Sequence, residues 1–459
     1  MKLKLIAAAL AMVSGAAFAG TNGDTTLDLS GASAVQQNVV RAVRGLCNAA
    51  GGNVTIYKEG NQTNVYRNWM AIQCSVPMAG GITLVRHTVD GGSLMSVLAM
   101  NDTTQVDFVN INSCSGSGVA GTGDLAPLSV NPADPEGAAL ANIVTGCAIV
   151  DGDSDGGFSD VEWQLSPELF GAKGDDFMAN VEVLPAFVGQ AFGVGVSQKL
   201  YLALQAKQKA DGLISASCAD GDYTPACQPS LSRADVASLI NNNEFNAVKT
   251  GGAGALIGSS VTDEVVYCRR VATSGTQASA EVFFLGKVCL GSDLGGAVPV
   301  IADANIDYGS YKVVRNSSTT NVRTCLNNTN DYAVGVVSAE NEPLATSQNW
   351  RFVKLDGVSV TEGTTNPTNR KTAIDGTYSF LMEVVTHVNE TDGATGSEER
   401  ELIEAIAGEL ALPVEEGGFA ARGLYQIRDG GFTNTAFPDS VSKVQRGGLT
   451  PNNCAPLLR

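Results

Sequence analysis

The sequence predicts a predominantly parallel α/β protein, because one order of segments recurs three times along the chain. The strand-like "TTLDLS" is followed by the loop "GASA", after which Val35, Val39, Val43 and Leu46 recur at helical spacing. The same order of strand, Gly/Ser loop and helix recurs at "GITLVRHTV" with "DGGSLMSVLAM", and at "EVVYCRRV" with "ATSGTQASAEVFFL". Parallel strands need a long crossover, usually a helix, so these three segments favour mainly parallel sheets flanked by helices.

The N-terminus predicts that the protein is exported. Lys2 and Lys4 precede the apolar run "LIAAALAMV", and "AFAG" provides small residues for cleavage between Ala19 and Gly20. Residues 1–19 are therefore interpreted as a secretory signal peptide, and no Cys stands at the cut to carry a lipid anchor. No other apolar run reaches the roughly 20 residues of a membrane span. We expect a periplasmic or secreted protein without membrane insertion.

Composition excludes several classes of function. The formal charge is −18, and loss of Lys2 and Lys4 would make it −20, so the surface repels nucleic acid and anionic membranes. The two histidines, His87 and His387, are interpreted as packing or surface residues. The sequence contains no GxSxG, HExxH or Walker loop. We therefore expect a protein that is not an enzyme.

Ten cysteines, an even number, are typical of disulfides in an oxidising compartment. The sequence has neither a CxxC pair nor histidines beside its cysteines, which argues against zinc. Cys218 and Cys227 flank a short acidic loop, and Cys114 and Cys147 flank a Gly/Pro/Ala-rich segment, so each couple is expected to pair. The other connections stay open.

Two Gly-containing strands predict where the chain crosses between two lobes. They are "FVGQAFGVGVS", residues 187–197, and "YAVGVV", residues 332–337. A segment rich in Gly, Pro, Ala and Asp, from about 113 to 155, is predicted to be a disulfide-pinned insertion. The acidic, helical "SEERELIEAIAGELAL" begins an extended C-terminal tail. The predicted organisation is a first lobe over 20–187, a second lobe over 188–337, and a return to the first lobe, with the tail, over 338–459.

The segment "CRRVATSGTQ" has the composition of an anion-binding loop. A Gly/Ser loop that enters a helix directs free backbone N–H groups and the helix dipole at a ligand. Ser274 and Thr276 would add hydroxyl donors, and Gly275 allows close approach of the backbone. Arg269 and Arg270 alternate along a strand, so only one can face the ligand, and we assign Arg270 to that role. Ser and Gly before a helix are also ordinary N-caps, so one such loop alone is weak support.

The order of these segments resembles that of the PstS-like periplasmic phosphate-binding proteins, a branch of the type 2 periplasmic binding protein superfamily. "RRVATSGT" resembles the family's Arg-Arg-x-x-x-Ser-Gly-Thr segment, "LSGASA" its N-terminal ligand loop, and "HTVDGGS" its second loop. "GGFSDVEWQLSPELF" resembles the family's Ser-Asp turn, and "NWRFVKLDGVSVT" its return to the first lobe. The insertion and the long tail have no counterpart in compact members of the family.

The resemblance implies a solute-binding protein that binds an oxyanion, phosphate in the first place, in the cleft between two lobes. It also allows for an ABC transporter permease as partner. Asp160 would accept the proton that phosphate keeps at neutral pH and would repel sulfate, which has none. Matched by position, the implied ligand-binding residues are Ser33, Ala34, Ser93, Asp160, Arg270, Ser274, Gly275 and Thr276.

The stretch "DGDSDGGFSDVE", residues 151–162, also matches the twelve-residue calcium loop of an EF-hand. Pro167 falls near the start of the expected exiting helix, which disfavours a paired EF-hand. We treat calcium as optional and expect no required cofactor. Two alternative functions stay open: a secreted calcium-binding structural or adhesion protein, and a binding-protein fold that acts as a scavenger without transport. The residues expected to bind calcium are Asp151, Asp153, Asp155, Gly157 and Glu162.

Overall fold

The computed structural model describes most of the chain between Thr25 and Leu458. The predicted signal peptide, residues 1–19, lies outside the described residues, and so do residues 117–141 of the predicted insertion. The described residues are 25–49, 54–59, 69–74, 83–100, 104–116, 142–289, 300–341, 343, 348–360, 371–389, 398–411, 424–426, 442–447 and 450–458.

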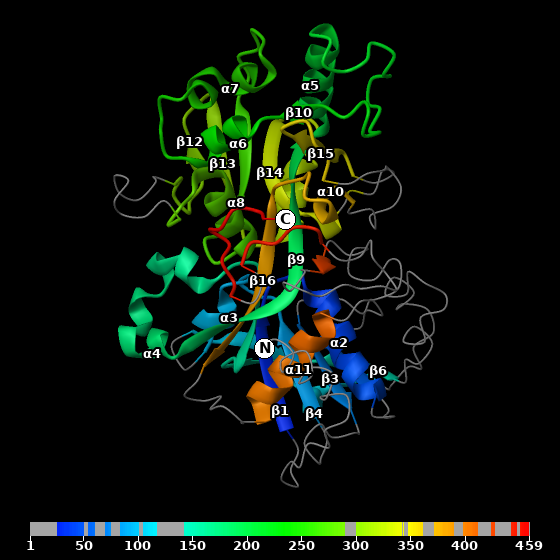
Figure 1. Ribbon diagram of the computed structural model, residues 1–459, viewed down its shortest axis with the longest axis vertical. Helices are drawn as coiled ribbons and strands as arrows, with labels where there is room; N and C mark the ends of the chain where they lie inside the picture. The colour runs from blue at the N-terminus through cyan, green and yellow to red at the C-terminus, as the bar shows by residue number, and fades with distance from the viewer. Residues whose placement is uncertain are drawn as a thin grey trace. The chain divides into compact units, whose positions relative to one another are not determined.

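The chain divides into two compact units. Strands β9 (Val181–Ser197) and β16 (Leu381–Asn389), which can be followed in Figure 1, each contain residues of both units. The short segment that follows Ser159 belongs to unit 2, although unit 1 precedes and follows it in the sequence. Unit 1 comprises Met1–Ser159, Phe170–Val188 and Val384–Glu416, and unit 2 comprises Asp160–Leu169, Gly189–Glu383 and Gly417–Arg459.

These boundaries differ in part from the predicted lobes. In β9 the chain passes into unit 2 after Val188, one residue later than the boundary predicted after residue 187. The return to unit 1 follows Glu383 in β16 rather than residue 337, because β14 (Tyr332–Ser338) and β15 (Trp350–Leu355) both pair with the unit 2 part of β9. The C-terminal tail from Gly417 onward belongs to unit 2.

The sheet of unit 1 has three parallel strands at its centre. β1 (Thr25–Gly31) pairs in parallel with β4 (Thr83–Thr88) on one side and with β8 (Gly156–Ser159) on the other. The alternating "TTLDLS" forms β1, and its Leu27 and Leu29 are fully buried. This centre places the loops after β1 and β4 at the same edge of the sheet.

Antiparallel strands flank this centre. β16 pairs with β8, and β3 (Trp69–Cys74) pairs with β4. β2 (Val54–Glu59) pairs with β3 in antiparallel fashion and with β6 (Asn142–Cys147) in parallel. β5 (Val106–Val109) and β7 (Ile149–Gly152) form a separate two-stranded sheet.

Helices cover both faces of the unit 1 sheet. Ser30 Oγ donates to the Met95 carbonyl in α3, whereas a Cβ at Gly156 would lie 3.1 Å from Ile403 of α11. Gly156 is paired with Leu29, so these two residues point to the same face of the sheet. Ser30, the next residue after Leu29, points to the opposite face, and α3 and α11 therefore lie on opposite faces. α2 lies beside α11, as Figure 1 shows. The helices of unit 1 are α2 (Gln36–Ala49), α3 (Met95–Leu98), α4 (Asp175–Ala179) and α11 (Glu398–Ala411).

Unit 2 repeats the arrangement of a parallel centre with antiparallel flanks. β11 (Val265–Arg270) pairs in parallel with β13 (Tyr311–Asn316) and with β14. β12 (Ile306–Asp307) is antiparallel to β13, and β9 is antiparallel to β14 and β15. β10 (Ser230–Leu231) pairs in parallel with β15. Each unit is therefore a mixed α/β structure with parallel central strands, which confirms the predicted fold class.

Alternation along β11 decides which helix covers which face of this sheet. Arg269 pairs with Glu281 of α8, whereas the preceding Cys268 is bonded to Cys325 of α9. α8 and α9 therefore cover opposite faces of β11. The helices of unit 2 are α5 (Gln198–Ala210), α6 (Arg233–Ile240), α7 (Ala247–Ile257), α8 (Gly275–Leu285), α9 (Thr319–Leu326) and α10 (Lys371–Ile374). The remaining elements of the chain are η1 (Ile111–Ser113), η3 (Trp163–Leu165), η4 (Pro167–Leu169), η5 (Gly171–Lys173), η7 (Ala339–Asn341) and β17 (Leu424–Gln426).

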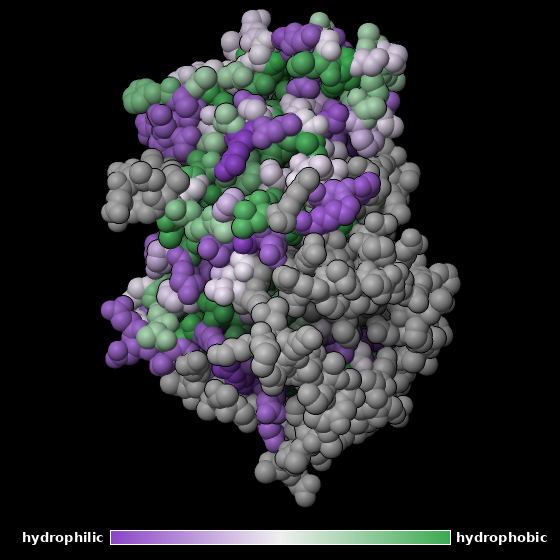
Figure 2. All heavy atoms as spheres, viewed as in Figure 1, coloured by the Kyte–Doolittle hydropathy of each residue, from purple (hydrophilic) through white to green (hydrophobic). Residues whose placement is uncertain are grey.

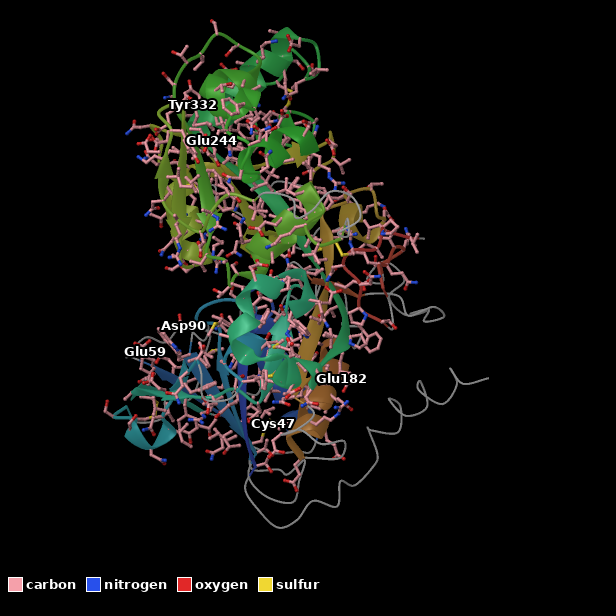
Figure 3. The ribbon with its side chains drawn as sticks, turned by 90° about the vertical axis from the view of Figure 1, so that its left-hand side faces the viewer. Cys47, Glu59, Asp90, Glu182, Glu244 and Tyr332 are labelled. Carbon is pink, nitrogen blue, oxygen red and sulfur yellow. A yellow bond between two sulfur atoms is a disulfide. The ribbon has the colours of Figure 1, made fainter. Side chains whose placement is uncertain are left out.

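All ten cysteines are joined in disulfides, and each disulfide lies within one unit. The two predicted pairs, Cys114–Cys147 and Cys218–Cys227, are confirmed. Cys47, labelled in Figure 3, links α2 to β3 through Cys74. The other pairs are Cys268–Cys325 and Cys289–Cys454, and the second of these attaches the C-terminal tail to the end of α8.

The described surface is mixed in polarity. Figure 2 shows hydrophilic and hydrophobic residues interspersed over the part of unit 2 that is visible from that side. Leu213 and Phe245 are exposed by 75% and 88%, and they lie in separate loops. Within the described ranges, the helices are all too short or too polar to cross a membrane.

Candidate functional site

The carboxyl end of β11 carries two arginines that serve different purposes. Arg269 is buried on the α8 face, where it forms ion pairs with Glu281, 3.5 Å away, and with Asp303. Asp303 also pairs with Arg315 of β13 at 2.8 Å. Arg269 is therefore neutralised by two carboxylates and belongs to the internal charge network of unit 2.

Arg270 lies on the α9 face and is 5% exposed. Its Nη1 donates to Thr319 Oγ1 at 2.7 Å, and its Nη2 approaches the Ser317 carbonyl at 3.4 Å. Its Nε is buried and has no hydrogen-bond partner among the described residues. A guanidinium has five N–H donors, so this side chain keeps donors for a further acceptor.

The surroundings of the Arg270 guanidinium are electropositive. Thr319 is the first residue of α9, and the Ser318 side chain caps that helix by accepting from Asn321 N at 3.2 Å. The bond to Thr319 thus brings the guanidinium to a helix N-terminus, which itself has about half a positive charge. The buried guanidinium and the half-buried helix N-terminus together favour an anion beside them.

The predicted loop residues Ser274, Gly275 and Thr276 form the start of α8, as the Gly/Ser motif predicts. Ser274 is the N-cap residue, but its side chain makes no capping hydrogen bond to the helix. All three residues are buried. Gln277 anchors the loop to the strand, because its Oε1 accepts from the Arg270 backbone N at 3.1 Å.

Asp160 is the acidic member of the unit 2 site. It directly follows β8 in the sequence, is 1% exposed, and belongs to unit 2. Burial lowers the pKa of Arg270 to about 10, and the negative charge of Asp160 opposes this shift. The structure therefore brings Asp160 and Arg270 within electrostatic reach of each other, as two of the residues predicted for one site.

In unit 1, Ser33 and Ala34 occupy the turn between β1 and α2. The turn is tied to β8, since Ala32 N donates to the Phe158 carbonyl at 2.8 Å. Gly31 makes this contact possible, because a Cβ there would lie 2.1 Å from the same carbonyl. Ala34 is buried and Ser33 is half-buried, so the serine is the more accessible of the two.

Ser93 lies in the second loop of unit 1, which begins at Asp90 after β4 (Figure 3). It is 3% exposed, and its carbonyl accepts from the Ser96 hydroxyl at 2.7 Å. Ser96 Oγ also lies 2.8 Å from Nδ1 of His387, in β16. Complete burial lowers the pKa of His387 to about 3, so this histidine is a neutral hydrogen-bonding residue behind the loop.

The residues expected to bind calcium lie in different structural settings. Asp151 belongs to β7 and is exposed, opposite Asp107 of β5. Asp155 accepts the backbone N–H of Asp28 at 2.7 Å. Gly157 lies inside β8, where it pairs with Ser30 of β1. Residues 156–159, which belong to the predicted calcium loop, form a strand of the sheet.

The other two residues expected to bind calcium, Glu162 and Asp153, also lie in separate surroundings. Glu162 belongs to unit 2, where both of its carboxylate oxygens accept hydrogen bonds from Asn453. Asp153 is half-buried in the segment between β7 and β8. Across the described part of the chain, no group of three or more His, Cys, Asp or Glu side chains has an arrangement that could hold a metal ion.

No family model matches the chain, and no curated protein matches it. Among solved structures, the chain is similar to a protein from Clostridium perfringens, crystallised with bound phosphate and provisionally described as a phosphate ABC transporter substrate-binding protein. The identity is 10%, the TM-score is 0.42, and the match covers 88% of this chain and 100% of that one.

Sequence reasoning did not identify several residues that shape these sites. Thr319 follows "NSS", a Ser-rich N-cap signal, so a helix start was detectable but its contact with Arg270 was not. His387 and Asn453 contact the loop residues from 291 positions away in the sequence. Contacts at this separation leave no local signal in one sequence.

Proposed function

We propose that this protein is an exported solute-binding protein whose ligand is an oxyanion, with phosphate as the specific ligand. The observation that carries the proposal is the buried Arg270 guanidinium, which has an Nε without a hydrogen-bond partner among the described residues and lies at the N-terminus of α9. A buried cation is costly unless it is paired and hydrogen-bonded. An oxyanion would accept the remaining N–H donors and offset the positive charge.

Asp160 gives the proposal its selectivity. A carboxylate near Arg270 offsets part of the positive charge, and it also disfavours a second anion unless that anion carries a proton. Phosphate retains at least one proton at neutral pH, which Asp160 can accept, whereas sulfate has none. Asp160 would therefore favour phosphate by making sulfate binding repulsive.

The unit 1 loops would supply neutral donors. Ser33 and Ala34 precede α2, and Ser93 precedes α3, so these residues lie at one edge of that sheet. Neutral donors can bind an oxyanion without adding net charge. This assignment of Ser33, Ala34 and Ser93 to the ligand rests on the family resemblance.

The five disulfides support an oxidising compartment outside the cytoplasm. Export fits the signal peptide predicted for residues 1–19. A transporter permease as partner, in the manner of other solute-binding proteins, is part of the proposal.

Titration calorimetry with phosphate and sulfate on wild type and Arg270→Gln tests the proposal. A charge-assisted hydrogen bond contributes about 1.5–3 kcal/mol, so Arg270→Gln should weaken phosphate binding at least about tenfold. Arg315→Gln is the matched control, because Arg315 is a partly exposed arginine on the adjacent strand β13. Phosphate binding that is absent in wild type, or unchanged in Arg270→Gln, would contradict the proposal.

A further inference from the structure

The C-terminal tail of the chain holds the turn that carries Asp160. The tail is attached to unit 2 by the disulfide between Cys289 and Cys454. Asn453, the residue before that cysteine, is 2% exposed. The disulfide therefore fixes the position of a buried amide.

Asn453 binds Glu162 through two hydrogen bonds. Its backbone N donates to Glu162 Oε1 at 2.7 Å, and its Nδ2 donates to Glu162 Oε2 at 2.8 Å. Glu162 is 6% exposed and lies two residues after Asp160. Both oxygens of a buried carboxylate are thus engaged by one residue of the tail.

The same amide also binds the strand that leaves unit 2. Glu383 N donates to Asn453 Oδ1 at 2.7 Å, and Asn453 Nδ2 donates to the Glu383 carbonyl at 2.9 Å. Glu383 is the last unit 2 residue of β16. Asn453 therefore joins the Asp160 turn to a strand of unit 2, and its Nδ2 donates to both partners, which a side chain without a donor could not do.

Ion pairs of Lys287 fix the other end of the turn. Lys287, just after α8, pairs with Glu168 at 2.7 Å and with Glu281 at 2.6 Å. The turn from 160 to 169 is thus tied to α8 at one end and to the tail at the other. These contacts explain why it belongs to unit 2.

We propose that Asn453 is a positioning residue for Asp160, so that the C-terminal tail determines how strictly the site discriminates between protonated and unprotonated oxyanions. This proposal rests on the proposed function. Without the Asn453 side-chain amide, the buried Glu162 carboxylate loses the donor on Oε2, and it would move towards water. Asp160, two residues away, would then lose its fixed position relative to Arg270.

Hydrogen exchange tests the positioning without any ligand. In Asn453→Ala, exchange in peptides covering residues 160–166 should rise at least tenfold over wild type. The matched control is Asn452→Ala, because Asn452 is the same residue type, adjacent and exposed. If Asn453→Ala does not fold, Asn453→Ser replaces it, since it keeps a polar side chain, loses the Nδ2 donor and places no second carboxylate beside the buried Glu162. Wild-type exchange rates in the 160–166 peptides would overturn the proposal.

Calorimetry with phosphate and with sulfate tests the consequence for binding. The ratio of the two affinities should fall at least tenfold in Asn453→Ala, towards the ratio in Asp160→Asn, and should stay at the wild-type value in Asn452→Ala. Increased exchange with an unchanged ratio would overturn the role in discrimination. If wild type binds neither anion, the proposed function fails, and the exchange measurement alone decides whether Asn453 positions the turn.

Discussion

The centres of the two units have the same plan but different charge. Both have three parallel strands, and in both the middle strand leads through a Gly/Ser loop into a helix. β11 in unit 2 ends in the buried Arg270, whereas β1 in unit 1 ends in Gly31, packed against the backbone of β8. The same framework can therefore present a cation or only neutral donors, depending on the last residues of its central strand.

The two centres also differ in how closely neighbouring strands of the same sheet approach each other at a glycine. A Cβ at Gly157 of β8 would lie 1.8 Å from the Ser30 carbonyl, whereas one at Gly335 of β14 would lie 2.9 Å from the Cys268 carbonyl. Unit 1 is thus the centre with less room for side chains. The predictions below test this difference and the difference in charge.

Gly157→Ala should have the largest effect. A contact of 1.8 Å cannot be relieved by moving a flexible side chain, so β1 and β8 would have to separate. We expect a loss of more than about 4 kcal/mol in the free energy of unfolding, measured by chemical denaturation. Gly335→Ala should cost less, and Gly171→Ala, with nothing within 4 Å of its Cβ, should change stability by at most about 0.5 kcal/mol. Equal losses at all three glycines would contradict this comparison.

Acid should destabilise unit 1, because the two histidines of the sequence, His87 and His387, both belong to this unit. Burial lowers the pKa of His87 to about 4 and that of His387 to about 3, from an ordinary value of 6.5. The unfolded chain therefore binds protons below pH 6.5 that the folded chain does not, so stability is full above pH 6.5 and falls as the pH drops towards 4. At pH 5 the expected loss is about 2 kcal/mol for each histidine.

Denaturation at pH 7 and pH 5 checks this prediction. The difference in unfolding free energy between the two pH values should shrink by about 2 kcal/mol in His87→Leu. The stability of His87→Leu at a single pH does not test the prediction. Both ring nitrogens of His87 are buried without hydrogen-bond partners among the described residues, which costs free energy, and Leu removes this cost at every pH. An unchanged difference would show that His87 does not cause the acid sensitivity.

The sequence predicted the parts of this structure that depend on local patterns. The strand–loop–helix order at "TTLDLSGASA" and "CRRVATSGTQ" predicted the parallel centres and the helices α2 and α8 that follow the two loops. Alternation along a strand also separated Arg269 from Arg270, because adjacent residues of a strand point to opposite faces. Such features need no knowledge of distant contacts.

Pattern matching failed where the tertiary surroundings decide the outcome. "DGDSDGGFSDVE" satisfies the EF-hand spacing, but four of its twelve residues, Gly156–Ser159, form a strand that pairs with β1 and β16. The return to unit 1 near residue 338 was also misplaced, since β15 continues the unit 2 sheet through its pairing with β9. Both outcomes depend on strand pairings between residues far apart in the sequence.

Asp160→Asn tests the role of charge in unit 2, because it removes the negative charge near Arg270 and leaves unit 1 unchanged. The amide can donate a hydrogen bond where the carboxylate can only accept one, so sulfate should become acceptable. We expect the ratio of phosphate to sulfate affinity to fall by about tenfold or more, which corresponds to about 1.4 kcal/mol. Competition calorimetry of the two anions measures this ratio. A ratio equal to that of wild type would remove Asp160 from the anion site.

Ser33→Ala should have the smallest effect, because it removes a neutral donor from the unit whose central strand β1 does not end in a cation. A neutral hydrogen bond contributes about 0.5–1.5 kcal/mol, so phosphate affinity should fall by roughly two- to tenfold. Ser274→Ala, at the N-cap of α8, is the matched change in unit 2, and its hydroxyl makes no capping bond whose loss would confuse the result. Calorimetry should rank both serine variants well below Arg270→Gln. If Ser33→Ala weakened phosphate binding as much as Arg270→Gln, the charge of Arg270 would not be the main source of affinity. The difference in charge between the two centres would then not explain how phosphate binds.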